Sequence, residues 1–598
     1  MGKKRYTPRQ TWGFLKLLVP RVGPYKGALA VAAVLLLMAT AIGLAFPLVV
    51  RELLDSAFLA GDSRQLNLIA AGLLGLFALQ AVINFGQSYL TASTSERVVA
   101  TLRQDLFKAL VYQPPGFFDN RRVGELTSRI SSDTGLLQGV LRFGVPELIR
   151  QGVFLVGALF LVTVTHPQLT LATLVAIPFT AVVGWLLGRR VRRLSTSIQD
   201  RLAAAVSRAE QVFTQIQIVQ AFTREDWEER RFRGEVEDVR DEGLRRAVAR
   251  AGLTGAVTFS AFGAIVLVLW VGGRLVLEGV LTAGDLVAFL LYAVTIAGAV
   301  ISLAGFWGNL QEAAGAAERI FDLIHHPVEL RTPEGPTVLP RPVRGEVTYR
   351  NVSFRYGPDL PLVLDGIDVE IGQGERVALV GSSGAGKSTM ASLLPRFYDV
   401  VGGAVRLDGI DVRRLDLQEL RGQIGMVPQE PMLFAGTVRE NLAYGRPGAT
   451  DPDIWEAARL AHAHEFITGF PDGYDQVVGE RGVTLSAGQR QRIAIARVML
   501  KKPAVLILDE ASSSLDAESE ALVQEALDHL MAGRTTIVIA HRLSTVIRAD
   551  SILVLDEGTI VDCGKHAELL HRSEVYHRLY SRQFDDAIAS SQKVEDQR

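Results

Sequence analysis

The sequence has a single cysteine, Cys563, among its 598 residues. One cysteine cannot form an intramolecular disulfide, and it excludes a metal site built from several thiolates. Cys563 lies in a short β-rich run, which favours a small structural residue in a hairpin strand. We therefore assign it no catalytic role.

A net charge of one sign is also lacking. The 63 lysine and arginine residues balance 64 aspartate and glutamate residues, so the formal charge is −1. This balance gives no indication of a polyanionic partner, and we expect no nucleic-acid binding. Internal repeats are not recognisable, and the only low-complexity tract is a polar tail after Asp585.

Long apolar runs, by contrast, are abundant in the first half of the chain. Each is about 18 to 25 residues long, enough to cross a bilayer as a helix. A secretory signal is the alternative for the first run, but that run exceeds the usual apolar core of a signal. We therefore expect an all-α membrane domain ahead of a soluble one. The six predicted spans cover residues 27–50, 66–90, 148–165, 169–187, 252–272 and 283–305.

Basic residues indicate how these spans are oriented. They cluster in the N-terminal segment, after the second span and after the fourth span, whereas the loop between spans three and four is only His166-Pro167-Gln168. The positive-inside rule then places both termini and both long loops in the cytoplasm. We expect a multi-pass protein of the inner or plasma membrane, with the lipid bilayer as its surroundings.

The two cytoplasmic loops, of about 55 to 65 residues, are too periodic and charged to be slack linkers. They should extend the spans as helices. Residues 117–126 and 211–219 are short patches where each helix could turn back, and a plain helical hairpin with apolar packing is the alternative.

Proline density and β-rich runs divide the rest of the chain. Prolines between residues 326 and 343 indicate a linker, and short β-rich runs alternate with helical stretches beyond it. This pattern predicts an α/β nucleotide-binding domain with a largely parallel core sheet and antiparallel additions. The expected organisation is a transmembrane domain over 1–325, a linker over 326–343, a nucleotide-binding domain over 344–585 and a tail over 586–598.

A phosphate-binding loop follows the apolar run at 376–380 and opens a helical stretch. Strand, glycine loop and helix are the context in which main-chain N–H groups wrap phosphates. Lys387 then meets the β- and γ-phosphate oxygens, and the Ser388 hydroxyl is placed to bind Mg²⁺. The predicted nucleotide contacts are Gly381, Ser382, Ser383, Gly384, Ala385, Gly386, Lys387, Ser388 and Thr389.

Other polar residues end predicted core strands, where a parallel sheet gathers catalytic groups. Asp509 could reach Mg²⁺ through water while Glu510 faces the attacking water; capping of the next helix is the alternative for either. His541 could hold that water or the γ-phosphate, although a lone histidine is usually structural. Gln429 could touch Mg²⁺ or the water. Tyr356 could stack on adenine or pack as a core aromatic.

With these motifs the chain resembles the ATP-binding-cassette (ABC) exporters of the half-transporter type, along nearly its whole length. The resemblance also includes the segment at 479–482, the D-loop ending in Asp516 and the FFD…GEL…SRI pattern of the first cytoplasmic loop. The family's signature motif corresponds to Leu485, Ser486, Ala487, Gly488 and Gln489. It implies ATP and Mg²⁺ as cofactors, and catalytic roles for Glu510, His541 and Gln429.

The resemblance also implies a dimer, because the signature and D-loop of one chain contact the ATP held by the phosphate loop of the other. It identifies the patches near 119–126 and 211–220 as coupling helices that dock on the nucleotide-binding domains. A homodimer is favoured because the catalytic residues are all present, and the intact half of an unequal pair is the alternative. The family signature usually reads LSGGQ, so Ala487 is a departure. Its Cβ could crowd a phosphate or strain a backbone that needs positive φ; we expect a tuned site rather than a dead one.

The cargo is less constrained. The predicted spans hold few ionisable side chains, which favours a hydrophobic or amphipathic substrate such as a lipid or a drug. Asn84, Gln87 and Asn309 could line a cavity or bond between helices. The resemblance favours export by alternating access. An importer or an ATP-gated channel on the same architecture is the alternative, and a soluble ABC ATPase is disfavoured by the spans.

Overall fold

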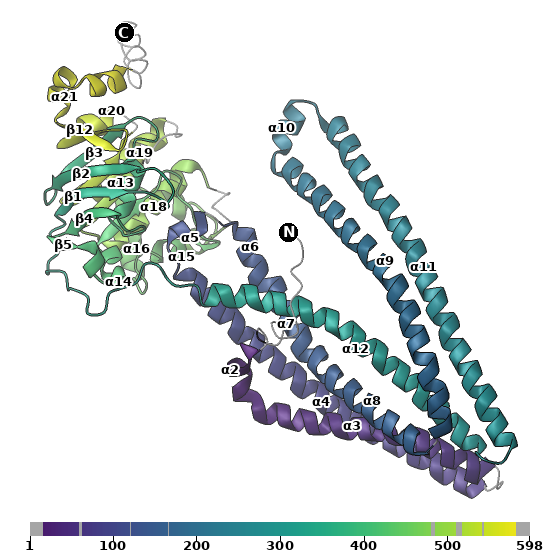
Figure 1. The fold of residues 1–598 in the computed structure, drawn as a ribbon. Coiled ribbons are helices and arrows are strands. Elements are labelled where there is room, and N and C mark those ends of the chain that lie inside the picture. Colours follow the sequence, from purple (N-terminus) through teal and green to yellow (C-terminus); the bar gives the residue numbers. More distant parts are fainter. Residues whose placement is uncertain are drawn as a thin grey trace. The chain divides into compact units, whose positions relative to one another are not determined.

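The computed structural model describes residues 13, 16–58, 63–119, 121–165, 167–479, 485–509, 517–540 and 543–581 (Figure 1). Its contacts divide the chain into two compact units. The first consists of residues 1–110 and 126–325, and the second of residues 111–125 and 326–598. The short segment 111–125 therefore groups with the C-terminal half of the chain.

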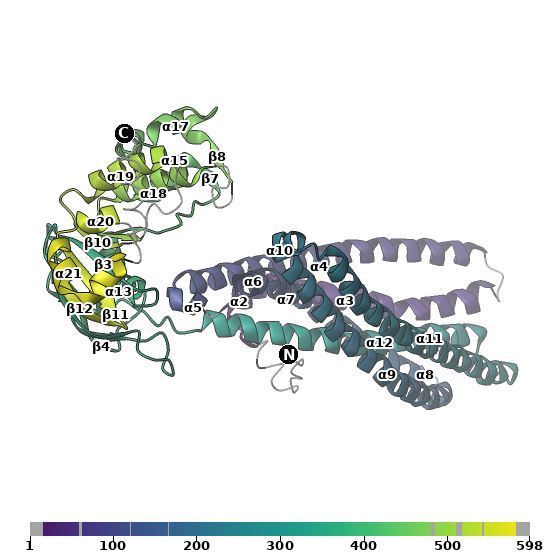
Figure 2. The same ribbon diagram turned by 90° about the horizontal axis from the view of Figure 1, so that it is seen from above.

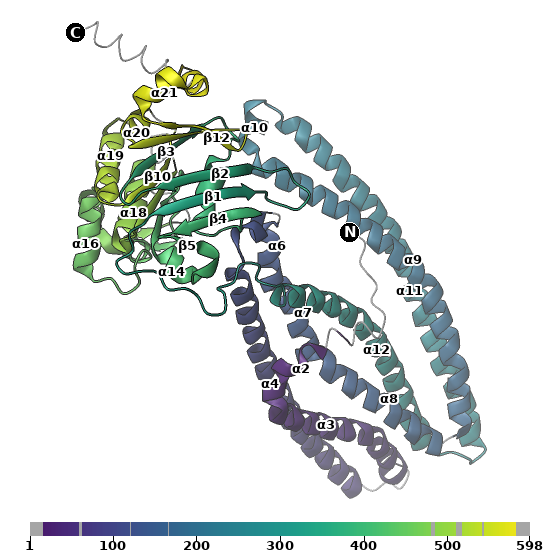
Figure 3. The ribbon, with the colours of Figure 1, turned by 60° about the vertical axis from the view of Figure 1, so that its left-hand side comes forward.

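The first unit is made of helices. Its elements are α2 (Val19–Val22), η1 (Gly23–Tyr25), α3 (Lys26–Glu52), η2 (Leu53–Phe58), α4 (Ser63–Val111), α6 (Val123–Ser128), η3 (Arg129–Asp133), α7 (Thr134–Gly139), η4 (Val140–Gly144), α8 (Val145–Thr165), α9 (Pro167–Thr214), α10 (Ile216–Ala221), α11 (Glu225–Leu277) and α12 (Ala283–Ile324). Helices α9 and α11 run side by side, and the short α10 joins them at one end (Figures 1 and 3).

Five helical stretches in the described part of the chain are long and apolar enough to cross a membrane: Val19–Asp55, Arg64–Val111, Val123–Thr165, Glu225–Leu277 and Ala283–Ile324. Five of the six predicted spans fall within them. The remaining predicted span, 169–187, lies in α9, where most of its side chains are not described. The helical membrane region predicted from the sequence is confirmed.

Polar contacts connect the ends of two of these helices. The Asp55 carboxylate, just beyond α3, accepts hydrogen bonds from Thr282 Oγ1 at 2.7 Å and from the Gly284 N–H at 3.0 Å. Arg51 Nε lies 2.8 Å from the buried Asp285 carboxylate. These contacts tie the end of α3 to the capped start of α12.

The second unit is built on two main sheets. The six-stranded sheet has the order β12-β11-β3-β10-β9-β6, in which β11, β3, β10, β9 and β6 are parallel and β12 is antiparallel. A four-stranded antiparallel sheet has the order β2-β1-β4-β5 (Figure 3). The strands are β1 (Val347–Phe354), β2 (Leu364–Ile371), β3 (Arg376–Gly381), β4 (Gly402–Leu407), β5 (Ile410–Asp411), β6 (Ile424–Val427), β7 (Gly436–Thr437), β8 (Val477–Val478), β9 (Val505–Asp509), β10 (Thr535–Ile539), β11 (Ser551–Asp556) and β12 (Thr559–Gly564). The predicted parallel core with antiparallel additions is therefore confirmed.

Alternating side chains give the six-stranded sheet a core on each face. On β9, Val505 and Ile507 pack with the four-stranded sheet, while Leu506 and Leu508 pack with the helices on the other face. This is the period-two alternation of a strand buried on both sides. Helices α15, α17, α18 and α19 gather at one end of the unit (Figure 2).

The helices of the second unit complete these layers. They are α5 (Pro115–Asp119), α13 (Lys387–Leu393), η5 (Val412–Arg414), α14 (Leu417–Gly422), α15 (Val438–Ala443), α16 (Asp451–Leu460), α17 (His464–Thr468), η6 (Gly473–Asp475), α18 (Ala487–Lys501), α19 (Ala517–Met531), α20 (Leu543–Ile547) and α21 (His566–Arg572). Helix α5 comes from the first of the two patches predicted to turn back, and α10 from the second.

Candidate functional site

Four neighbouring parallel strands bring the predicted site residues to one edge of the six-stranded sheet. Leu379 on β3 pairs with Ile539 on β10, Ile539 pairs with Asp509 on β9, and Leu508 pairs with Val427 on β6. The phosphate loop, Asp509 and the segment leading to Gln429 therefore all follow strand ends at the same edge. Such an edge is where parallel α/β sheets bind ligands.

The phosphate loop depends on glycine at two positions. Gly386 has φ +99° and lies so close to β2 that a Cβ would come within 2.6 Å of Leu364 Cδ2. At Gly381, a Cβ would lie only 2.2 Å from the Leu555 carbonyl oxygen. Larger residues would push the loop away from the sheet. The glycines thus hold the backbone in a tight turn whose residues 382–384 are exposed.

Lys387 lies inside this loop. Its side chain is largely buried, and Nζ donates to the carbonyl oxygens of Gly381 at 2.9 Å and Ser382 at 2.8 Å. A buried ammonium held by neutral carbonyls, inside a turn of N–H groups, is suited to an anion. Ser388 is exposed at the start of α13, which leaves its hydroxyl accessible to a ligand.

The remaining predicted catalytic residues are only partly described. Asp509 is half-buried at the end of β9, and Gln429 is exposed two residues after β6. Glu510, His541 and Asp516 lie outside the described residues, as do residues 480–484 next to the signature. The strands that lead to Glu510 and His541 are β9 and β10, which lie side by side.

Tyr356 is half-exposed rather than part of the core. Its hydroxyl is 2.8 Å from Thr389 Oγ1 on α13, and its ring meets the edges of Phe354 at 4.9 Å and Tyr398 at 5.2 Å between centroids. An aromatic ring held against the helix that follows the phosphate loop is accessible for stacking on a base.

Tyr398 extends this aromatic group to α5. Its hydroxyl donates to Asp119 Oδ2 at 2.8 Å. Burial, together with this hydrogen bond to a carboxylate, raises the pKa of the Tyr398 hydroxyl, so it remains a donor at neutral pH. Helix α5 is further held by Phe117, which is buried and whose ring centroid lies 5.2 Å from that of His326.

Sequence reasoning missed Tyr398. It lies beyond α13, outside every recognised motif, and its role is visible only because the fold brings residue 119 next to it. The only signal in the sequence was the aromatic pair Phe397-Tyr398 after the phosphate-loop helix. Such a pair is as typical of a hydrophobic core as of a functional contact.

The signature residues form the start of α18. Ser486 is the N-cap: its Oγ accepts from Gln489 N at 3.2 Å, and Gln489 Oε1 accepts from Ser486 N at 3.0 Å. Ala487 is the first residue of this right-handed helix and is not among the described residues with positive φ. The alanine therefore causes no backbone strain here. Leu485 and Gly488 are buried, whereas Ser486 is exposed.

Comparisons with known proteins place both halves of the chain in one family. The family model described as ABC transporter transmembrane region matches residues 29–300, and the model described as ABC transporter matches residues 364–513. The chain is 40% identical to a mitochondrial potassium channel ATP-binding subunit of Rattus norvegicus, over 99% of this chain and 84% of that protein.

A bacterial relative and a solved structure extend the comparison. An ATP-dependent lipid A-core flippase of Syntrophus aciditrophicus is 36% identical, over 98% of this chain and 96% of that protein. The fold is similar to the structure of a bacterial Atm1-family ABC exporter with ATP bound, with a TM-score of 0.78 and 30% identity; the match covers 94% of this chain and 98% of that one.

Proposed function

This chain belongs to the ABC transporter family as an ATP-hydrolysing, ATP-driven membrane exporter that works as a dimer, and from this premise we propose that its cargo is hydrophobic or amphipathic, such as a lipid or a drug. The long apolar helices carry this proposal, since a cargo that moves between them must tolerate an apolar surface. The similarity to a lipid A-core flippase supports it.

The chemistry is assigned to the residues at the edge of the six-stranded sheet. Main-chain N–H groups of the phosphate loop and Lys387 hold the phosphates, and Tyr356 stacks on the adenine. Ser388, Asp509 and Gln429 are oxygen donors of the kind that Mg²⁺ prefers. Mg²⁺ would neutralise charge on the phosphates during hydrolysis. Glu510 takes the proton of the attacking water, and His541 orients that water or the γ-phosphate.

The partner is proposed to be a second copy of this chain in the cell membrane. Ser486, Ala487, Gly488 and Asp516 of one copy complete the site formed by the other. Nucleotide binding then favours a closed dimer and hydrolysis releases it, so the membrane helices alternate between two states of different stability. The presence of Glu510, His541 and Gln429 in the sequence supports two equivalent sites.

A channel is the second candidate function. The name of the rat relative, a potassium channel ATP-binding subunit, favours it. In that case the chain would use ATP to regulate ion flow rather than to carry an amphiphile.

Flux in sealed inside-out vesicles tests the proposal. With ATP outside, vesicles containing the wild-type chain should accumulate a fluorescent hydrophobic compound, and vesicles containing Glu510→Gln should not. Movement of the compound out of the lumen would refute export. ATP-dependent potassium flux without accumulation of any amphiphile would favour the channel.

A further inference from the structure

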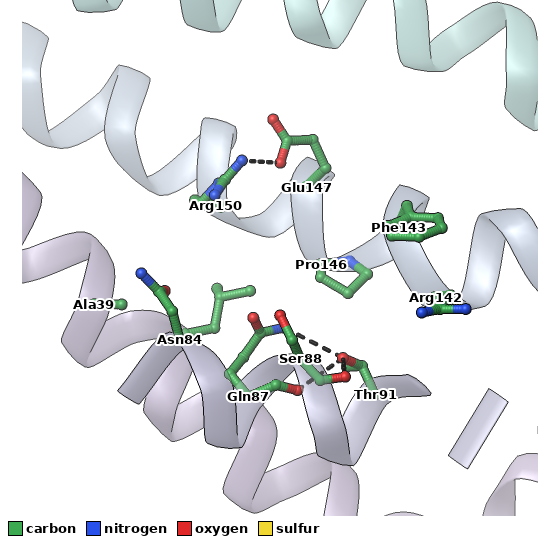
Figure 4. Close-up of a pocket in the computed structure, with 11 residues that line it drawn as sticks. Ala39, Asn84, Gln87, Ser88, Thr91, Arg142, Phe143, Pro146, Glu147 and Arg150 are labelled. Atoms are coloured by element: carbon green, nitrogen blue, oxygen red, sulfur yellow. Dashed lines mark hydrogen bonds and ion pairs between the residues drawn. The ribbon is translucent and has the colours of Figure 1, made fainter. Parts of the chain in front are cut away.

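A polar cavity of about 300 Å³ lies among helices of the first unit (Figure 4). Its walls come from α3, α4, η4 and α8. The lining residues of α4 end the second predicted span, and those of α8 begin the third, so the positive-inside rule places the cavity near the cytoplasmic leaflet. A polar cavity at that depth is accessible to the head group of a lipid in the cytoplasmic leaflet.

One wall is a stripe of polar side chains on α4. The four residues recur at the spacing of a single helical face on α4: Asn84, Gln87, Ser88 and Thr91. Thr91 Oγ1 donates to the Gln87 carbonyl oxygen at 2.7 Å, while Asn84 and Ser88 are exposed and are drawn on the cavity side in Figure 4. The stripe offers amide and hydroxyl donors to a ligand.

The opposite wall carries charge. Glu147 is already engaged: it pairs with Arg150, and its Oε1 accepts from Gln151 Nε2 at 2.7 Å and from Ser302 Oγ at 3.1 Å. Arg142 makes no ion pair or hydrogen bond within the described part of the chain, and its guanidinium lies 5.0 Å from the Phe143 ring centroid. The lining contains two arginines, Arg142 and Arg150, but only one glutamate, Glu147. The cavity therefore has a net positive charge.

Apolar residues complete the lining, namely Leu36, Ala39, Phe143 and Pro146. We propose that this cavity binds the acidic head group, a phosphate or a carboxylate, of an amphiphile whose apolar part lies along the neighbouring helices. The inference rests on the proposed export function and narrows its cargo to anionic amphiphiles. A volume of about 300 Å³ accommodates a head group but not a whole lipid.

These charges narrow the cargo expected from the sequence. The predicted spans hold few ionisable side chains, but Arg150 lies within the third of them, and Arg142 and Glu147 lie just before it. Charged side chains near the membrane interior favour a functional site with an oppositely charged ligand. Asn84 and Gln87 line the cavity. This was one of the two roles predicted for them, the other being hydrogen bonds between helices.

Binding without nucleotide tests the site separately from transport. Three fluorescent lipids with the same acyl chains are titrated onto the purified full-length protein in nanodiscs: a phosphatidic acid, a phosphatidylcholine and a diacylglycerol. The phosphatidic acid should bind at least about tenfold more tightly than the other two, because charge-assisted hydrogen bonds to arginine are strong. Equal affinity for all three would refute the inference.

Variants locate the site. Arg142→Gln should weaken binding of the phosphatidic acid about tenfold, and Arg142→Lys should recover most of the loss. Because Arg142 has no described ion-pair partner, its removal should leave folding intact, which thermal unfolding checks. Arg250→Gln, an exposed cation on α11 outside the cavity, is the matched control and should have no effect. Loss of affinity in the control as large as in Arg142→Gln would indicate general surface charge and overturn the inference.

Competition and flux measurements distinguish a soluble anion from an amphiphile, and failure of this inference from failure of the export proposal. Glycerol phosphate should compete only weakly with the lipid; competition at the same concentration would mean that a soluble anion, not an amphiphile, is the ligand. If vesicles show ATP-driven flux of a neutral compound but the phosphatidic acid has no preference, the inference fails and export stands. If no compound is transported, export fails whatever the binding result.

Discussion

At the scale of single residues, the signature alanine shows how local structure changes a sequence argument. The glycine that usually stands at this position of the family signature suggests a need for positive φ, and alanine would then be strained. In the structure Ala487 is the first residue of α18, where a right-handed conformation is ordinary. Its main-chain N–H remains at the exposed helix start beside Ser486, so the substitution removes no donor.

The prediction at this position is a small effect. Ala487→Gly should change the ATPase kcat by no more than about fivefold, because the extra backbone freedom of glycine costs at most about 1 kcal/mol. Steady-state ATPase measurements check this, with binding of ATP as the second reading. A gain of tenfold or more would show instead that the alanine Cβ partly disables the natural site.

At the scale of elements, α5 is held to the nucleotide-binding half by a short polar and aromatic chain. Tyr356 contacts the Tyr398 ring, and the Tyr398 hydroxyl donates to Asp119 at the end of α5. Since α5 is continuous in sequence with α4 and α6, a change at the aromatic group is connected to helices of the first unit. We therefore predict that this contact reports occupation of the nucleotide site to those helices.

Tyr398→Phe tests this connection because phenylalanine keeps the ring and removes only the hydroxyl. A hydrogen bond to a carboxylate contributes about 1.5–3 kcal/mol. We expect ATP affinity to stay within about twofold, and stimulation of ATPase activity by a transported compound to fall about tenfold.

Tyr474→Phe is the control, since its hydroxyl bonds to His464 at 2.8 Å, away from α5. Stimulation that survives in Tyr398→Phe as well as in this control would rule out a coupling role for the Asp119 contact.

The elements also show what the sequence could reveal. The run Val505–Asp509 is apolar throughout and ends in a carboxylate, so its place as a buried parallel strand follows from composition. Strand β4 was not predicted, because it begins with Gly402-Gly403 and its longer pairing is with β1, about 50 residues earlier in the chain. For the same reason the cavity wall formed by Arg142 and Arg150 could not be foreseen: its charges meet the α4 stripe only after the helices pack.

At the scale of the whole molecule, the two features that we propose to form a shared nucleotide site lie at separate places in one chain. The phosphate loop follows β3 at the edge of the parallel sheet, whereas Ser486 begins α18 among the helices packed on its other face. Ser486 exchanges hydrogen bonds with Gln489, within its own helix start. The proposed site shared between two copies would explain why the chain carries the signature in addition to the phosphate loop.

Mixed dimers test this sharing. Chains carrying Ser486→Ala and chains carrying Lys387→Ala are co-expressed with different tags and purified through both. In the mixed dimer one site receives both substitutions and the other receives neither, so about one nucleotide per dimer should be trapped by vanadate.

Each variant alone should trap far less, because both of its sites carry one substitution. The wild-type dimer provides the upper reference, and a dimer assembled from two differently tagged Lys387→Ala chains provides the lower one. Trapping in the mixed dimer equal to the mean of the two separate variants would mean that each chain hydrolyses ATP with its own signature, which would refute the shared site.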